Sequence, residues 1–435
     1  MVIYNHRDLL IGDGIMDYTP KYLIFVDPNF GDLGHNKYYK ISPNGDNTFT
    51  AEYGRVGAAP QTKIYPMSKW NSTLSSKLKK GYVDRSDLMQ EVIADSKVKD
   101  KSNEVDEFDL IQNLSVREIV KRLWDYANKT IQSAYSVRAE AVTQAMIDAA
   151  QEKIDYIAAN YKDWTVEEFN KNLNELFVIV PRKMKRVSDC LVSDSSEYDK
   201  KLSEEQSLLD TMAGQVYKPK AKNVDTDSEI KASESILQKM GITMEEATQE
   251  DITKIKKAMG DSAGKFYKAW RVTNLETEKN YQKFTTENNI GNVKLLCHGS
   301  RNQNWFNILK MGLKIRPAGA IATGSMFGLG IYWSNPEKYK GGVAKSIGYT
   351  SLGGYWTRDY QNCGFLAFFD VAIGDSVDAY SFDSKYYSYN LNRLKKDNPN
   401  AWSLWAHGNT SMLRNDEIIV YDDRQMTIRY LVEIR

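Results

Sequence analysis

The 435-residue sequence predicts a multidomain α+β protein. Residues 21–88 alternate short apolar runs with turn residues, which is typical of a small β-rich domain. Residues 108–217 carry apolar side chains at helical spacing, which predicts an α-helical bundle. Residues 225–435 contain a series of short apolar strands, which predicts a mostly antiparallel α+β domain. We therefore expect three domains, at residues 1–100, 105–217 and 225–435.

The composition excludes several broad classes of protein. A hydrophobic content of 42% and a charged content of 26% are ordinary for a soluble globular protein. The formal net charge of +1 gives no global reason for binding nucleic acid, so any such affinity must come from a local patch. No apolar run approaches the ~18 residues of a membrane helix, so we expect no membrane partner. The three cysteines are far apart and lack metal-ligand spacing, so we expect reduced thiols and no bound metal.

These observations predict a soluble, intracellular monomer, nuclear if the source is eukaryotic and cytoplasmic if it is bacterial or viral.

The N-terminal domain combines basic and aromatic side chains. Strands are expected at residues 22–26, 37–41 and 48–53, followed by a helix at residues 68–80. Residues 34–85 hold nine Lys or Arg against three Asp or Glu, interleaved with aromatic residues that include Tyr38, Tyr39, Tyr53, Tyr65 and Trp70. Basic and aromatic side chains on a compact domain suit contact with nucleic-acid phosphates and bases. A solvated basic face on a protein-interaction module is the equal alternative on charge alone.

The central segment predicts four amphipathic helices, with no visible chemistry of their own. Ser115, Thr165 and Ser203 are each followed three residues later by Glu or Gln, which is the pattern of a helix capping box. Pro181 is expected to end the third helix. Residues 86–107 and 218–234 are polar and are expected to be linkers.

Chemistry-bearing residues gather in the C-terminal segment. His298, Gly299 and Ser300 directly follow an expected strand at 293–297. A glycine-spaced loop at 324–330 leads into a short strand at 331–333, without the G-x-G-x-x-G fingerprint of a dinucleotide fold. Glu417 begins a strongly apolar strand, where a carboxylate costs burial energy unless it is paired or functional. Further strands are expected at 266–272, 365–373 and 428–434, after a helix at 248–259.

The motifs at 298–301, 326–333, 345–349 and 411–422 together resemble the catalytic signature of the poly(ADP-ribose) polymerase family of ADP-ribosyltransferases. In that family a His, a Tyr and a Glu converge on NAD, and the resemblance places them at His298, Tyr332 and Glu417. It implies NAD as substrate and no metal. The residues that the resemblance assigns to NAD binding are Gly299, Ser300, Asn304, Lys345, Ser346 and Tyr349.

The resemblance also gives each of these residues a role. Gly299 and Ser346 would hold the carboxamide, while Tyr349 and Tyr332 would sandwich the nicotinamide ring. Ser300 and Asn304 would join His298 on the ribose and adenosine side, and Lys345 would lie beside Glu417. Residues 318–326 would form a loop over the donor site. Asp416 lies next to Glu417 and could be mistaken for the catalytic carboxylate. The resemblance selects Glu417, because the family's Ile-Val-Tyr-Asp sequence after the acid falls at residues 419–422.

Residues 53–57, Tyr-Gly-Arg-Val-Gly, resemble the core of a WGR domain with Tyr in place of the usual Trp. This implies binding of DNA ends or nicks, for which we expect Arg55, Lys77, Lys79 and Lys80 to supply contacts. Residues 108–217 resemble the helical regulatory domain of DNA-dependent members, which hinders access of NAD until DNA binds.

The function that follows is a DNA-stimulated poly(ADP-ribose) polymerase of the DNA damage response, in the pentosyltransferase class of glycosyltransferases. It would modify acceptor proteins, including itself, and release nicotinamide. Two alternatives stay open: a mono-ADP-ribosyltransferase, and a catalytically silent scaffold that binds DNA ends. The intact His298, Tyr332 and Glu417 argue against the scaffold.

Overall fold

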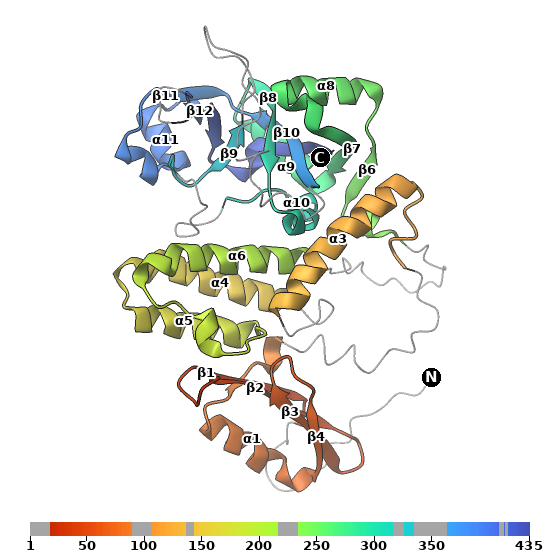
Figure 1. The fold of residues 1–435 in the computed structure, drawn as a ribbon, viewed down its shortest axis with the longest axis vertical. Helices are drawn as coiled ribbons and strands as arrows, with labels where there is room; N and C mark the ends of the chain where they lie inside the picture. Colours follow the sequence, from red (N-terminus) through yellow and green to blue (C-terminus); the bar gives the residue numbers. More distant parts are fainter. Residues whose placement is uncertain are drawn as a thin grey trace. The chain divides into compact units, whose positions relative to one another are not determined.

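The computed structural model describes residues 18–88, 106–135, 143–215, 234–315, 326–334, 363–408, 413 and 416–435 (Figure 1). The described residues fall into two compact units. The first contains residues 18–88, 133–135, 143–153 and 162–197. The second contains residues 106–132, 154–161, 198–215 and the described residues from 234 onward.

The first unit is built on a five-stranded antiparallel sheet in the order β4-β3-β2-β1-β5. The three strands expected from apolar alternation form, and two were missed: β4 because its side chains are mostly exposed, and β5 because it has two residues. The elements are β1 Lys21–Asp27, β2 His35–Pro43, β3 Thr48–Arg55, β4 Gln61–Pro66, β5 Val83–Asp84 and the helix α1 Trp70–Lys79.

Helix α5, Val166–Ile179, also belongs to this unit, as does the first part of α4, Gln144–Asn160. Thr165 caps α5 with the expected capping box, because its hydroxyl accepts from the backbone of Glu168 and the Glu168 side chain accepts in return. After α5 the chain runs beside the sheet. The Asn36 side chain donates to the Arg182 carbonyl at 2.9 Å, and the Val187 amide donates to the Leu33 carbonyl at 3.1 Å.

The second unit is built on a nine-stranded sheet in the order β11-β12-β13-β9-β8-β10-β14-β7-β6. Every pairing is antiparallel except β11 with β12, which confirms the mostly antiparallel C-terminal domain. The strands are β6 Ile242–Glu246, β7 Phe266–Asn274, β8 Val293–Gly299, β9 Ile331–Ser334, β10 Gly364–Ala372, β11 Asp375–Ala379, β12 Ala401–Ala406, β13 Glu417–Val420 and β14 Met426–Ile434.

Helix α3 shares the hydrophobic core of this unit, because Ile119, Val120 and Leu123 are buried in the same cluster as Trp305 and Phe306. An ion pair between the partly exposed Arg122 and the buried Glu433 joins α3 to β14. The helices are α3 Leu114–Ala134, of which residues 114–132 lie in this unit, α6 Tyr198–Gln215, α7 Ile236–Lys239, α8 Gln249–Met259, α9 Leu275–Glu287, α10 Trp305–Met311 and α11 Leu391–Asp397.

Two expected helix caps were wrong. Ser115 lies inside α3, where its hydroxyl accepts a hydrogen bond from the Trp270 indole at 3.0 Å, and Asn113 bonds the Val116 amide instead. Ser203 lies inside α6, which begins five residues earlier at Tyr198. A Ser or Thr followed by Glu or Gln also occurs on the surface of a helix, so the apolar spacing located these helices better than the cap pattern did.

Among the described residues, no helix combines the length and the apolar character needed to span a bilayer.

Candidate functional site

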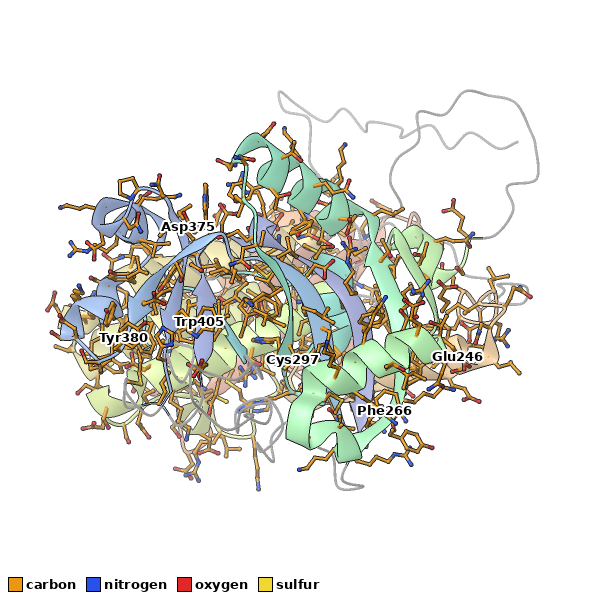
Figure 2. The ribbon with its side chains drawn as sticks, turned by 90° about the horizontal axis from the view of Figure 1, so that it is seen from above. Glu246, Phe266, Cys297, Asp375, Tyr380 and Trp405 are labelled. Carbon is orange, nitrogen blue, oxygen red and sulfur yellow. The ribbon has the colours of Figure 1, made fainter. Side chains whose placement is uncertain are left out.

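In the part of the chain that the structure describes, the large sheet is joined at its centre by a single residue pair. There, β8 and β9 pair through Cys297 and Ser334, whereas β8 pairs with β10 over seven positions. In Figure 2, Cys297 lies in the middle of the sheet, with Trp405 toward one edge and Phe266 toward the other. His298 follows Cys297 on β8, and Tyr332 lies on β9, so the junction brings two of the three predicted catalytic residues together.

His298 is fixed by the neighbouring strand. Its Nδ1 lies 3.1 Å from the backbone carbonyl oxygen of Tyr332. A carbonyl can only accept, so Nδ1 carries the proton and Nε2 is left as an acceptor. Burial lowers the pKa of His298, which keeps the imidazole neutral at pH 7. A neutral ring with a free Nε2 can accept a hydrogen bond from a ligand hydroxyl.

Glu417 lies on the same face of the sheet as Tyr332. Ile419 pairs with Tyr332 across β13 and β9, and Glu417 is two residues before Ile419, so the two side chains project the same way. Within the described residues the Glu417 carboxylate has no hydrogen-bond donor, and burial raises its pKa from 4.5 to about 7. A carboxyl group that titrates near neutrality can serve as a general base.

Asp416 serves the fold. It is buried, and its carboxylate accepts from the Trp405 indole at 3.1 Å and from the Gly408 backbone amide at 2.9 Å. These contacts tie the start of β13 to β12. They agree with Glu417, rather than Asp416, being the acid that faces the site.

The other predicted NAD-binding residues divide between described and undescribed parts of the chain. Gly299 ends β8, and the Asn304 side chain donates to the Ser300 hydroxyl at 3.0 Å. Gly299 and Ser300 directly follow His298, and Asn304 is bonded to Ser300, while their contact with NAD stays a prediction. Lys345, Ser346 and Tyr349 lie outside the described residues, as does most of the predicted loop at 318–326.

Helix α6 contacts the side of the site that holds Asn304, and the sequence did not predict this contact. The Thr211 hydroxyl lies 3.3 Å from Asn304 Oδ1, and Lys310 Nζ donates to the Ala213 carbonyl at 3.2 Å. Burial lowers the pKa of Lys310 to about 8. A Cβ added at Gly214 would lie 2.8 Å from Asn307 Cβ, so α6 and α10 are in close contact. The helical spacing placed Thr211 on an ordinary amphipathic helix and gave no signal for this contact.

The predicted contact between Arg55 and DNA needs correction. Its guanidinium donates to four backbone carbonyls, those of Leu33, Gly34, Met184 and Lys185, at 2.8 to 3.2 Å. The donors that a phosphate would use are therefore engaged within the first unit. Arg55 holds the segment after α5 against the β2 end of the sheet, and the local basic excess around it misled the assignment.

The three predicted DNA-binding lysines have different surroundings. Lys77 Nζ lies 3.9 Å from the centre of the Tyr39 ring and 5.3 Å from that of Tyr82. Burial, followed by the nearby lysines, lowers the pKa of Lys77. Lys79 and Lys80 are exposed at the end of α1. Only Lys79 and Lys80 present open ammonium groups for a phosphate without displacing an internal contact.

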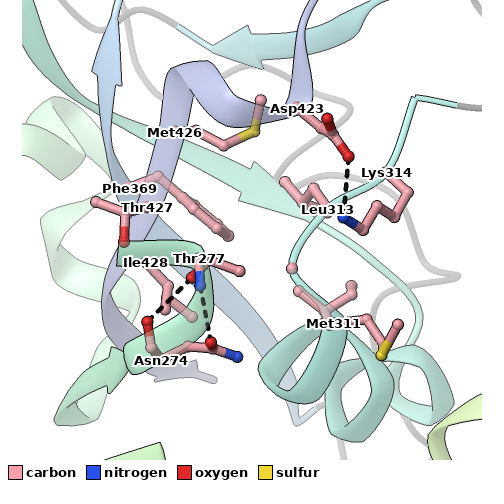
Figure 3. Close-up of a pocket in the computed structure, with 12 residues that line it drawn as sticks. Asn274, Thr277, Met311, Leu313, Lys314, Phe369, Asp423, Met426, Thr427 and Ile428 are labelled. Carbon is pink, nitrogen blue, oxygen red and sulfur yellow. Dashed lines mark hydrogen bonds and ion pairs between the residues drawn. The ribbon is translucent and has the colours of Figure 1, made fainter. Parts of the chain in front are cut away.

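In the described residues, no group of three or more His, Cys, Asp or Glu side chains has a metal-binding arrangement. A small pocket, partly open to solvent, lies where α9, α10 and the start of β14 meet (Figure 3). Lys314 and Asp423 form an ion pair there at 3.0 Å. None of the predicted site residues lines this pocket, so it belongs to a different region from the junction of β8 and β9.

The sequence matches two family models: the poly(ADP-ribose) polymerase catalytic domain over residues 247–435, and the WGR domain over residues 20–88. The uncharacterised protein 101L of invertebrate iridescent virus 6 is 31% identical over 201 residues, which are 46% of this chain and 79% of 101L. Protein 100L of the same virus, named as poly [ADP-ribose] polymerase-like, is 30% identical over 176 residues, covering 39% of this chain and 86% of 100L.

The match to the catalytic-domain model covers the sheet that carries His298, Tyr332 and Glu417, which defines the protein as one with an ADP-ribosyltransferase-type catalytic domain. The chain belongs to the poly(ADP-ribose) polymerase family, with a WGR domain ahead of the catalytic domain.

The cellular relatives are matched over a smaller part of their length. Human poly [ADP-ribose] polymerase 2 is 29% identical over 183 residues, covering 37% of this chain but 30% of the human protein. Rice poly [ADP-ribose] polymerase 1 is 29% identical over 212 residues, covering 43% of this chain but 20% of the rice protein.

Proposed function

We propose that the protein is a DNA-stimulated enzyme that transfers ADP-ribose from NAD to proteins, itself included, and to growing ADP-ribose chains, with release of nicotinamide. The observation that carries the proposal has two parts: His298 bonds the backbone of Tyr332 across β8 and β9, and Tyr332 and Glu417 share one face of β9 and β13. The family match supplies NAD as the substrate class.

Glu417 would act in two steps of the reaction: cleavage of NAD and attack by the acceptor hydroxyl. Cleavage of the bond between nicotinamide and ribose passes through an oxocarbenium-like state, in which positive charge develops on the ribose. An ionised Glu417 carboxylate stabilises that charge. The same carboxylate accepts the proton of the attacking hydroxyl, for which a pKa of about 7 suits a base at neutral pH.

His298 and Tyr332 would bind and orient the substrate. The free Nε2 of His298 accepts from a ribose hydroxyl, since its Nδ1 proton is donated to the Tyr332 carbonyl. The Tyr332 ring offers a flat surface for nicotinamide on the face of the sheet that also carries Glu417. Tyr349 and Ser346, which lie outside the described residues, would supply the remaining contacts to nicotinamide.

The direct test is an incubation of the purified protein with labelled NAD, with and without nicked DNA. We expect nicotinamide release and labelled protein that spreads into a ladder on a gel, both increased by the DNA. Absence of NAD cleavage under either condition contradicts the enzyme and leaves the silent scaffold. A single modified band favours mono-ADP-ribosylation.

Helix α6 would restrain the site until DNA binds. Support comes from its contacts to α10: Thr211 reaches Asn304, and Lys310 binds the carbonyl of Ala213. Helix α3 fits this role less well, because its apolar face is part of the core that holds Trp305 and Phe306. A fragment of residues 225–435 would lack α3 and therefore part of this hydrophobic core. The full chain is thus the better material for testing the restraint.

Gly214→Val is the sharpest change, because its new Cβ would meet Asn307 at 2.8 Å and push α6 away from α10. We expect NAD turnover without DNA to rise toward the DNA-stimulated rate. Glu204→Val is the matched control, since it adds the same β-branched side chain to an exposed position of α6. Equal DNA-free rates in the parent and in Gly214→Val contradict the restraint.

A further inference from the structure

The turn that precedes Tyr332 is held by hydrogen bonds from Tyr332 itself and from Tyr421, which follows the strand that carries Glu417. Residues 326–330 form this turn, which we call the glycine turn. The Tyr421 hydroxyl, one residue beyond β13, donates to the Phe327 carbonyl at 2.6 Å. The Phe327 amide donates to the Tyr332 hydroxyl at 2.9 Å, and that hydroxyl donates to the Gly328 carbonyl at 2.9 Å. A continuous chain of hydrogen bonds therefore runs from Tyr421 through the turn to Tyr332.

Close packing leaves the glycine turn little freedom on its other sides. Gly328 has a φ of +81°, and a Cβ there would lie 2.1 Å from the Tyr389 carbonyl oxygen. The Leu329 amide donates to that same carbonyl at 2.9 Å. A Cβ at Gly330 would lie 2.4 Å from the Ile419 side chain. The turn thus lies directly on β13, so its position and that of Glu417 are set by one strand.

We propose that Tyr421 is a positioning residue for the reaction: its hydroxyl fixes the glycine turn and so sets the orientation of the Tyr332 ring relative to Glu417. The hydroxyl of Tyr332 makes two hydrogen bonds to the turn, so it orients the ring instead of bonding to substrate. Tyr421 is buried and its hydroxyl bonds the Phe327 carbonyl, so we assign it no contact with substrate. The functional part of this proposal rests on the proposed NAD chemistry, whereas its structural part does not.

The first test follows the turn itself. In Tyr421→Phe we expect the amides of residues 327–330 to exchange with solvent about 2- to 10-fold faster in the folded full-length protein, the range that one lost hydrogen bond accounts for. Tyr389→Phe is the matched control. It removes the hydroxyl of another buried tyrosine in the same cluster, one that bonds Asp397 rather than the turn. Equal exchange in the parent and in Tyr421→Phe, or equal acceleration in both variants, overturns the proposal.

The second test follows the ligand. We expect Tyr421→Phe to weaken nicotinamide binding by about 2- to 10-fold, with unchanged affinity for ADP-ribose, which reports the His298 end of the site. Tyr332→Phe should give a similar loss, and the double variant should lose no more than either single one, because both act through one chain of hydrogen bonds. Additive losses, or a parallel loss of ADP-ribose affinity, overturn the positioning role.

If Tyr421→Phe fails to fold, Tyr332→Phe tests the proposal by itself. Unchanged hydrogen exchange of the amides of residues 327–330 in that variant refutes the chain of hydrogen bonds. A parent that binds neither nicotinamide nor ADP-ribose refutes the proposed function, while the exchange comparison still tests the hydrogen-bond chain.

Discussion

Glu417→Gln is the change on which the proposed chemistry depends most. Glutamine keeps the size of the side chain and can still donate to or accept from a ribose hydroxyl, but it cannot take a proton near neutral pH. Loss of a general base typically lowers a rate by ~10²–10⁴-fold. We therefore expect Glu417→Gln to lose chain extension far more than it loses nicotinamide release or attachment of the first unit.

The raised pKa adds a dependence on pH that the variant should lack. With a pKa of about 7, roughly 10% of Glu417 is ionised at pH 6 and about 90% at pH 8. Chain extension by the parent should therefore rise about tenfold between these values. The ratio of parent rate to Glu417→Gln rate should fall by the same factor on going from pH 8 to pH 6.

A stability measurement separates a catalytic defect from misfolding. A carboxyl whose folded pKa is raised from 4.5 to about 7 favours folding most when it is protonated. That stability is complete below pH 4.5 and is lost as the pH rises through 7. The upper limit is about 3 kcal/mol, reduced by the partial exposure of the group. Glu417→Gln should therefore be more stable than the parent at pH 8 and equally stable below pH 4.5.

The assay is product length on a gel beside nicotinamide release, for the parent, Glu417→Gln and Asp416→Asn at pH 6, 7 and 8. Asp416→Asn should lower thermal stability, because one of its bonds to Trp405 and Gly408 is lost. It should retain the pH profile of chain extension. Two outcomes would show that Glu417 is not the catalytic acid: long ADP-ribose chains made by Glu417→Gln, or a pH dependence of chain extension that is lost only in Asp416→Asn.

Four further predictions follow. Arg55→Lys should lower the free energy of unfolding by about 2 kcal/mol, because it keeps the charge but loses the fork that binds four carbonyls; unchanged stability with weakened DNA binding would restore Arg55 as a phosphate contact. Replacing Lys79 and Lys80 by Ala should weaken DNA binding and reduce the slope of log affinity against log salt by roughly 1 to 2 units in filter binding, whereas an unaltered slope would exclude both lysines. Tyr349→Ala should weaken benzamide-type inhibitors by about fivefold through the loss of ~1 kcal/mol of stacking, while Tyr349→Phe should not; equal inhibition of all three proteins removes Tyr349 from the site. Excess chelator should leave the initial rate with NAD unchanged, and a loss that zinc or magnesium restores would contradict a metal-free mechanism.

Local sequence patterns predicted most of the elements because each pattern reports a short-range property. Apolar runs located β8, β9 and β10, and helical spacing located α3 to α6. The same kind of evidence failed where a side chain's partner is distant in sequence. Ser115 bonds Trp270 instead of capping its helix, and Arg55 binds carbonyls some 130 residues away.

The sequence by itself determined the α+β class and the family, and it predicted His298, Tyr332 and Glu417 as the catalytic residues, because motifs record which residue types the chemistry requires. Tertiary structure decided how those residues are held. The pairing of β9 with β13 places Tyr332 and Glu417 on one face, and burial in that sheet raises the pKa of Glu417 to about 7. The contacts of Thr211 with Asn304 and of Tyr421 with Phe327 join segments about 90 residues apart. Such contacts depend on the packing of whole elements, which a local pattern of residues does not contain.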